Sequence, residues 1–189
     1  QILDEADGVL AFEPRENDLQ AKEVPTSQFC NKLFMMHGNL RVLEQKILTY
    51  DGLNLRRQFE LVEQICRSKS AIFALAQPWV DTDDAAAQAA LLVQEMEWGN
   101  LVNGRPSLSE KFRGGTVTYG SDTIEPIEQF FHRLCRAKDL LMVTEVMLED
   151  MFGTRRSELQ NFLGYIRKCY GTLKTFNILF AQRDDYFTT

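Results

Sequence analysis

Residues 157–180 read SELQNFLGYIRKCYGTLKTFNILF, and apolar side chains return in this stretch at steps of three and four residues. An α-helix makes one turn in about 3.6 residues, so this spacing places those side chains on one face of a long helix. They are Leu159, Phe162, Ile166, Cys169, Leu173, Phe176 and Phe180. A continuous apolar face must be covered by other apolar faces, so the stretch predicts a helical bundle.

The same spacing recurs elsewhere and predicts an all-α fold, an antiparallel helical bundle of about five long helices. The helices are expected at residues 26–49, 53–76, 82–101, 125–152 and 154–183, in one domain at 26–189. Residues 102–124 are expected to form one long irregular loop, because glycine and proline interrupt the helical pattern there. Within that loop, 116–119 has β character, which leaves a short strand open.

Two glycines lie inside predicted helices, Gly38 in the first and Gly171 in the last, within similar flanking sequences. A glycine in a helix interior costs about 1 kcal/mol relative to alanine. Either the similarity arises by chance between two amphipathic helices, or the two helices cross closely at these glycines.

Charge is unevenly distributed in a chain of net charge −6. Residues 1–25 hold seven acidic and two basic side chains, a net charge of −5, whereas residues 154–189 carry +3. We expect 1–25 to be a mobile acidic N-terminal arm with one or two anchor points, the alternative being a packed first helix. The arm, the 82–101 helix or an acidic partner should lie near the basic C-terminal segment. An acidic total argues against a nucleic-acid partner.

The expected compartment is the cytoplasm. No apolar run approaches the roughly 20 residues that a membrane-spanning helix needs, so membrane insertion is not expected. The cysteines at 30, 66, 135 and 169 are widely spaced, which favours reduced core thiols. A disulfide framework and a four-cysteine metal site are the less favoured alternatives.

Motifs that mark catalytic, metal or phosphate sites are missing from the sequence. Neither His37 nor His132 has a glutamate three residues before it, as a di-iron helical bundle would need. No glycine-rich phosphate loop and no nucleophile turn is present. We therefore predict a non-enzymatic chain with no catalytic residues, no metal site and no cofactor.

The function that remains is a protein–protein interaction module, acting as an adaptor, a regulator or a subunit of a larger assembly. The partner is another protein, and the sequence leaves the oligomeric state unknown. Arginine and aromatic side chains dominate interface energetics, so the loop supplies the candidate partner-binding residues. They are Arg105, Lys111, Phe112, Arg113 and Tyr119.

A second candidate site is a contact for an anion or an acidic partner, formed where two helices begin side by side. Its residues are Arg56, Arg57, Arg155 and Arg156. The alternative function is a small-molecule or lipid-binding helical domain with an aromatic- and Met-lined cavity. This alternative depends on the thirteen phenylalanines and six methionines of the chain.

Overall fold

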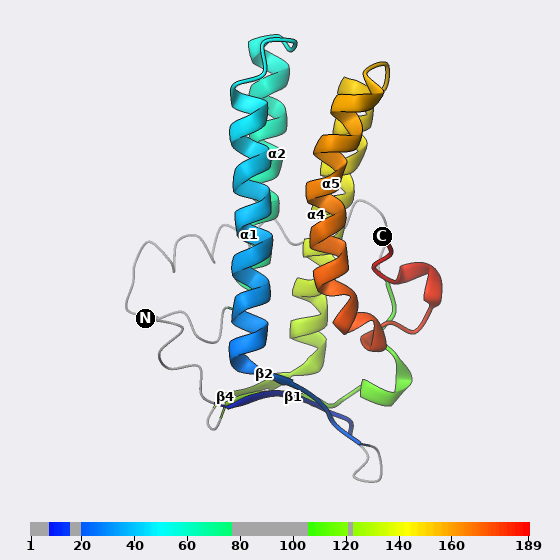
Figure 1. The fold of residues 1–189 in the computed structure, drawn as a ribbon. Coiled ribbons are helices and arrows are strands. Elements are labelled where there is room, and N and C mark those ends of the chain that lie inside the picture. The colour runs from blue at the N-terminus through cyan, green and yellow to red at the C-terminus, as the bar shows by residue number, and fades with distance from the viewer. Residues whose placement is uncertain (1–7, 16–19, 77–105, 121–122) are drawn as a thin grey trace.

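The computed structural model describes residues 8–15, 20–76, 106–120 and 123–189, which form long helices and an antiparallel sheet (Figure 1). The helices are α1 (Thr26–Leu48), α2 (Leu55–Ala74), α4 (Ile127–Phe152) and α5 (Arg156–Leu173). The strands are β1 (Val9–Glu13), β2 (Lys22–Pro25), β3 (Thr116–Tyr119) and β4 (Thr123–Pro126). Short 3-10 helices lie at Glu110–Phe112, Lys174–Leu179 and Arg183–Asp185.

The four helices pack as two antiparallel pairs, and the sheet closes one end of the array (Figure 1). Helices α2 and α5 each pack against both α1 and α4. The four helices occupy the predicted ranges to within two residues at most ends, but α5 ends at Leu173 and continues as 3-10 helix. The helix expected at 82–101 lies outside the described residues.

The prediction of an all-α fold is wrong, because four strands form an antiparallel sheet in the order β2-β1-β3-β4. Two of these strands come from residues 1–25, which the sequence suggested as an acidic arm. The alternation of buried and exposed residues in these strands is short. In β1, Leu10 and Phe12 are buried while Val9 and Glu13 are exposed. A strand of four or five residues contains about two such alternations, too few to stand out among the surrounding charges.

A cluster of four phenylalanines joins the sheet to the helices. Phe12 of β1 packs edge-on against Phe130 of α4, with ring centroids 5.0 Å apart, and against Phe176, at 5.8 Å. Phe29 of α1 lies 5.8 Å from Phe176 in the same edge-on geometry. All four rings are buried, so this cluster is the core at the sheet end.

A buried charged network holds the sheet on α4. Arg133 of α4 donates to Oε2 of Glu125 at 2.9 Å and to the hydroxyl of Tyr119 at 3.1 Å. Its second contact with Glu125 completes a two-pronged ion pair, and Tyr119 also donates to Glu125. Burial raises the pKa of the Tyr119 hydroxyl, so it stays protonated as a donor. The network therefore connects β3, β4 and α4 at one point.

We expect Arg133→Ala to lower the free energy of unfolding by about 3–5 kcal/mol, because it leaves the mostly buried Glu125 carboxylate without its cationic partner. The matched control is Arg113→Ala, which removes an exposed ion pair to Glu110 of 2.8 Å and should cost about 1 kcal/mol or less. Urea denaturation of both variants makes the measurement. Equal losses would contradict a stabilising role for the buried network.

Candidate functional site

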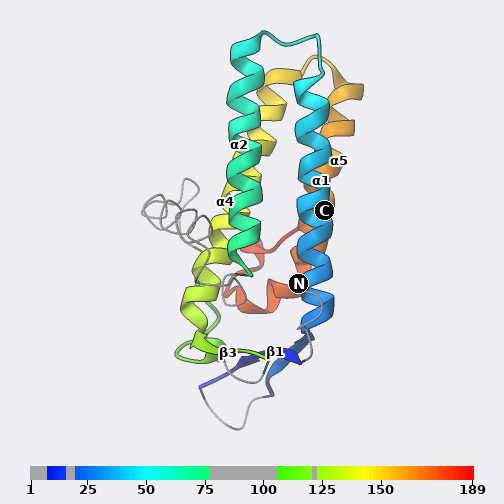
Figure 2. The same cartoon turned by 90° about the vertical axis from the view of Figure 1, so that its left-hand side faces the viewer.

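A pocket of about 130 Å³ opens between α1 and the C-terminal end of α2. These two helices are the ones nearest the viewer in Figure 2. The pocket is called here the α1–α2 pocket. Its lining residues are Cys30, Leu33, Phe34, His37, Ile72, Phe73 and Ala76. The lining is almost entirely apolar, because two antiparallel helices contribute aliphatic and aromatic side chains from both sides.

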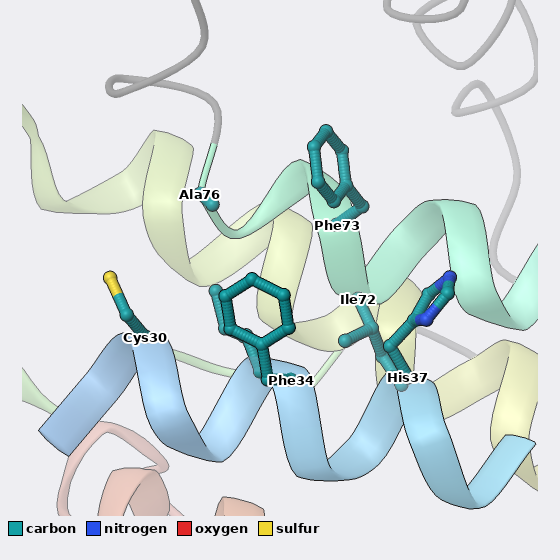
Figure 3. Close-up of a pocket in the computed structure, with 7 residues that line it drawn as sticks. Cys30, Phe34, His37, Ile72, Phe73 and Ala76 are labelled. Carbon is teal, nitrogen blue, oxygen red and sulfur yellow. The ribbon is translucent and has the colours of Figure 1, made fainter. Parts of the chain in front are cut away.

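Two phenylalanines line this pocket while remaining in contact with solvent. Phe34 on α1 is 57% exposed and Phe73 on α2 is 48% exposed. Figure 3 shows the two rings rising from the two helices, with His37 beside them and Ile72 beneath. Exposed aromatic side chains around an apolar hollow are typical of interaction sites, since each exposed ring is poorly hydrated in the free protein.

A small polar cluster lies farther along the same pair of helices. The carboxylate of Glu44 on α1 accepts hydrogen bonds from the ammonium of Lys69 and from the thiol of Cys66, the latter at 3.4 Å. The side chains of Glu44 and Lys69 are both mostly buried. The cluster therefore neutralises its own charges between α1 and α2.

His37 lines the edge of the pocket and is uncharged at neutral pH. Partial burial lowers the pKa of the His37 imidazole, and the charges of Lys69 and Arg41 lower it further, although Glu44 opposes them. Because the ordinary pKa of histidine is about 6.5, His37 is neutral at pH 7. A neutral ring suits the binding of an apolar group.

The two cysteines of this face are poor nucleophiles. Burial raises the pKa of Cys30, and burial together with the Glu44 carboxylate raises the pKa of Cys66. The thiolate is the reactive form, so both thiols are mainly unreactive at neutral pH. Within the described ranges no group of three or more His, Cys, Asp or Glu side chains is arranged to hold a metal ion.

The candidate partner-binding residues of the predicted loop do not form one exposed surface. Phe112 and Tyr119 are buried core side chains, so a partner cannot reach them. Lys111 is exposed, with its ammonium 5.1 Å from the ring of Phe112. Arg113 is exposed and pairs with a glutamate of the same turn. Arg105 lies outside the described residues.

The two predicted arginine pairs lie at one end of the molecule, where α2 and α5 begin (Figure 1). Arg155 is a structural side chain there. It donates to the hydroxyl of Tyr50 at 3.1 Å and to the carbonyl of Gly52 at 3.0 Å, and its guanidinium covers the Tyr50 ring. These contacts connect the α1–α2 turn with the α4–α5 turn.

The other three arginines of that candidate site are more exposed. Arg56 pairs with Glu60 at 2.9 Å, and Arg57 lies 3.9 Å from Asp150. Arg156 is exposed and forms no ion pair with the described residues. Most of the predicted anion contact is therefore occupied by interactions within the chain.

The basic side chains of the C-terminal segment also form no ion pair in the part of the chain that the structure describes. Arg167 donates to Gln160 at 2.9 Å, and Lys174 donates to Thr189 at 2.7 Å. The acidic segments 1–7 and 77–105 lie outside the described residues, so the predicted proximity of 82–101 to these bases stays a prediction.

Sequence reasoning missed the α1–α2 pocket. Phe34 follows directly after Leu33 of the apolar series on α1, and so widens the apolar face toward one side. Phe73 widens the face of α2 next to Ile72 in the same way. The available signal was this pair of extra aromatic residues, but it becomes a site only when α1 and α2 are paired in their observed register.

Comparison with protein families places the chain in one of them. It belongs to the family described as a domain of unknown function (DUF8685), whose model matches residues 4–76 and 102–186. Searches of curated proteins and of solved structures found no match. The first matched block contains β1, β2 and both helices of the pocket, and the second contains the remaining strands and helices.

The Glu44 cluster generates a prediction about pH. Burial would raise the pKa of Glu44, but the hydrogen bonds from Lys69 and Cys66 outweigh burial, and the net pKa lies below its ordinary value of 4.5. The contribution of Glu44 to stability is therefore complete above pH 4.5. It is lost as the pH falls toward the folded-state pKa, because the unfolded chain takes up the proton first.

We expect Glu44→Gln to lower the free energy of unfolding at pH 7 by about 1–3 kcal/mol, and by less at pH 3.5. The control is Glu63→Gln, which removes an exposed pair with Arg67 and should cost about 0.5 kcal/mol or less. Urea denaturation at the two pH values tests this. A Glu44→Gln effect that stayed constant with pH would contradict the assigned pKa direction.

Proposed function

We propose that this chain is a non-enzymatic protein–protein interaction module, an adaptor, regulator or subunit of a larger assembly. In this proposal the α1–α2 pocket receives one apolar side chain of the partner protein. The observation that carries the proposal is the pair of exposed rings, Phe34 and Phe73, at the opening of an apolar pocket. Interfaces concentrate their binding energy in such pockets, where an anchoring side chain is fully removed from water.

The size of the pocket favours a side chain over a free ligand. Its volume is about 130 Å³, whereas sites for small molecules and cofactors usually measure about 300–1,000 Å³. An apolar cavity of about 150 Å³ holds one benzene molecule, so this pocket fits a single aromatic or aliphatic side chain. No methionine is among its lining residues, unlike the Met-lined cavity that the sequence suggested as the alternative.

The compartment proposed for this function is the cytoplasm. All four cysteines are free, and three of them are buried. Free thiols are usual where the redox environment is reducing. None of the described helices has the length and hydropathy needed to cross a membrane.

Photo-crosslinking tests where the partner binds. Benzoylphenylalanine at position 34 should form a covalent adduct with the partner in the native cell, and mass spectrometry of the adduct then identifies it. The same residue at position 59, on α2 but outside the pocket, is the control, because Phe59 is also exposed, at 66%. Crosslinking to the same protein with equal yield from both positions would contradict docking at the pocket.

Truncation of the exposed rings tests their contribution to affinity. We expect Phe34→Ala and Phe73→Ala each to weaken binding of the purified partner by tenfold or more, about 1.4 kcal/mol or more. Phe59→Ala should leave the affinity unchanged, and all three variants should unfold within about 1 kcal/mol of the parent protein. Isothermal titration calorimetry and urea denaturation provide the two measurements.

The small-molecule alternative makes a different prediction. Native mass spectrometry of freshly purified protein should show a retained ligand if the chain binds a small molecule or lipid. A single mass equal to that of the protein alone would count against that alternative, and a retained ligand lost in Phe34→Ala would count against the interaction module.

A further inference from the structure

We infer that the partner presents an acidic α-helix, which lies along the exposed side of α1 from the α1–α2 pocket, across Gly38, to a hollow near the end of α1. This inference rests on the proposed function, because the anchoring side chain of the same helix occupies the pocket. It adds the secondary structure, the charge and the path of the partner segment.

The docking surface follows one side of α1. Phe34, Gly38, Val42, Gln45 and Thr49 recur at steps of three and four, so they share one face of the helix. Phe34 and Val42 are exposed apolar side chains on this face. At 1.5 Å per residue the face is about 22 Å long, which matches a partner helix of about 15 residues.

The far end of this face is hollowed. The hollow is lined by Arg41, Val42, Gln45, Lys46 and Thr49. The α1–α2 pocket lies at the other end, so two depressions flank Gly38 on one helix. Two depressions with an open position between them match the ridge of side chains on a second helix, which packs its ridges into such grooves.

The contacts of Gly38 within the described residues do not explain why a glycine stands at this position. It lies in the middle of α1, it is exposed, and a Cβ added there would meet no atom of the described residues within 4 Å. A Cβ at Gly171 would meet Thr189 at 3.5 Å and no atom of α1, so the two helices do not cross at these glycines. A glycine in a helix interior costs about 1 kcal/mol relative to alanine, and it permits the close approach of another backbone.

The charges of this face favour an acidic partner. The single acidic residue of α1 is Glu44, and Lys69 already occupies it. Arg41 and Lys46 line the hollow and form no ion pair within the described ranges. Carboxylates on the partner would complement these two cations. A second copy docked face to face would instead bring the same cations together, which disfavours a dimer through this surface.

A helical partner fits the three features of this face, which are the two depressions, the open position at Gly38 and the uncompensated cations. Anchors at positions i, i+4, i+7 and i+11 of this helix span about 16 Å, which reaches from the pocket to the hollow. Other complexes in which a helix binds in a groove use anchors on one helix face in the same way. A small residue facing Gly38 allows the two backbones to approach, and acidic residues beside the anchors face Arg41 and Lys46.

The inference is tested with a synthetic probe and the complete 189-residue chain. The probe is a fluorescent peptide of about 18 residues built from Glu, Ala and Leu, with one Phe as the anchor. Two matched peptides replace every Glu by Lys or carry a central proline that breaks the helix. We expect the acidic peptide to bind at least tenfold more tightly than either, measured by fluorescence anisotropy, and to weaken as salt is raised.

Matched variants of the protein locate the binding. Gly38→Leu should weaken the acidic peptide at least tenfold, whereas Gly164→Leu on α5, where an added Cβ also meets open space, should not. The double variant Arg41→Glu and Lys46→Glu should abolish binding. The double variant Arg167→Glu and Lys168→Glu reverses two exposed charges on α5 and should leave it unchanged.

Several results would overturn the inference. Equal binding of the acidic and basic peptides, or full binding of the acidic peptide by Gly38→Leu, would each do so. Self-association of the chain that Gly38→Leu abolishes would point to a second copy as the occupant. Binding to phosphatidylserine vesicles in place of the acidic peptide would point to a membrane surface. If the partner crosslinked at position 34 is lost in Phe34→Ala but binds Gly38→Leu and the charge-reversed protein normally, the acidic helix fails and the proposed function stands. If Phe34→Ala has no effect either, the proposed function fails as well.

Discussion

The architecture depends on the contact among four phenylalanine rings at the sheet end of the bundle. Phe12, Phe29, Phe130 and Phe176 come from a strand, two helices and the 3-10 turn after α5, and each meets at least two of the others. Aromatic pairs of this kind contribute about 0.5–1.5 kcal/mol each beyond the area they bury. Segments from both ends of the chain meet here, so the cluster joins the sheet to the helical array.

The sequence predicted the helices well because their signal is long. The series that begins with Phe29, Leu33, Met36 and Leu40 is buried throughout, as a period of 3.6 residues maintained over many turns requires. The sheet was missed because its strands are short and its pairing is distant. The register places Glu13 opposite Thr116, more than 100 residues away. No local pattern contains that pairing, and the acidic surroundings of the first strands resemble solvated chain.

The candidate sites show the same division between local and distant information. Residue type alone pointed to Phe112 and Tyr119 as contacts for a partner, but both complete the core, and the hydroxyl of Tyr119 belongs to the Arg133 network. Residue type does not distinguish an aromatic ring that anchors a partner from one that closes a core. To predict the α1–α2 pocket, one must know how distant segments pair, because Phe34 and Phe73 come together only through the antiparallel pairing of two helices.

The packing of α2 on its other side fixes the helix that forms one wall of this pocket. Gln64 donates to the carbonyl of Leu140 at 3.0 Å, and the hydroxyls of Ser68 and Thr144 lie 3.1 Å apart, all within the buried interface with α4. Directional bonds in a buried interface set the register of one helix against another, because a shift would leave polar groups unpaired. With α2 held in this way, Phe73 is presented at a constant position beside α1. In the proposed function, the partner side chain would enter a preformed pocket, and little of its binding energy would be lost to reorganisation of the helices.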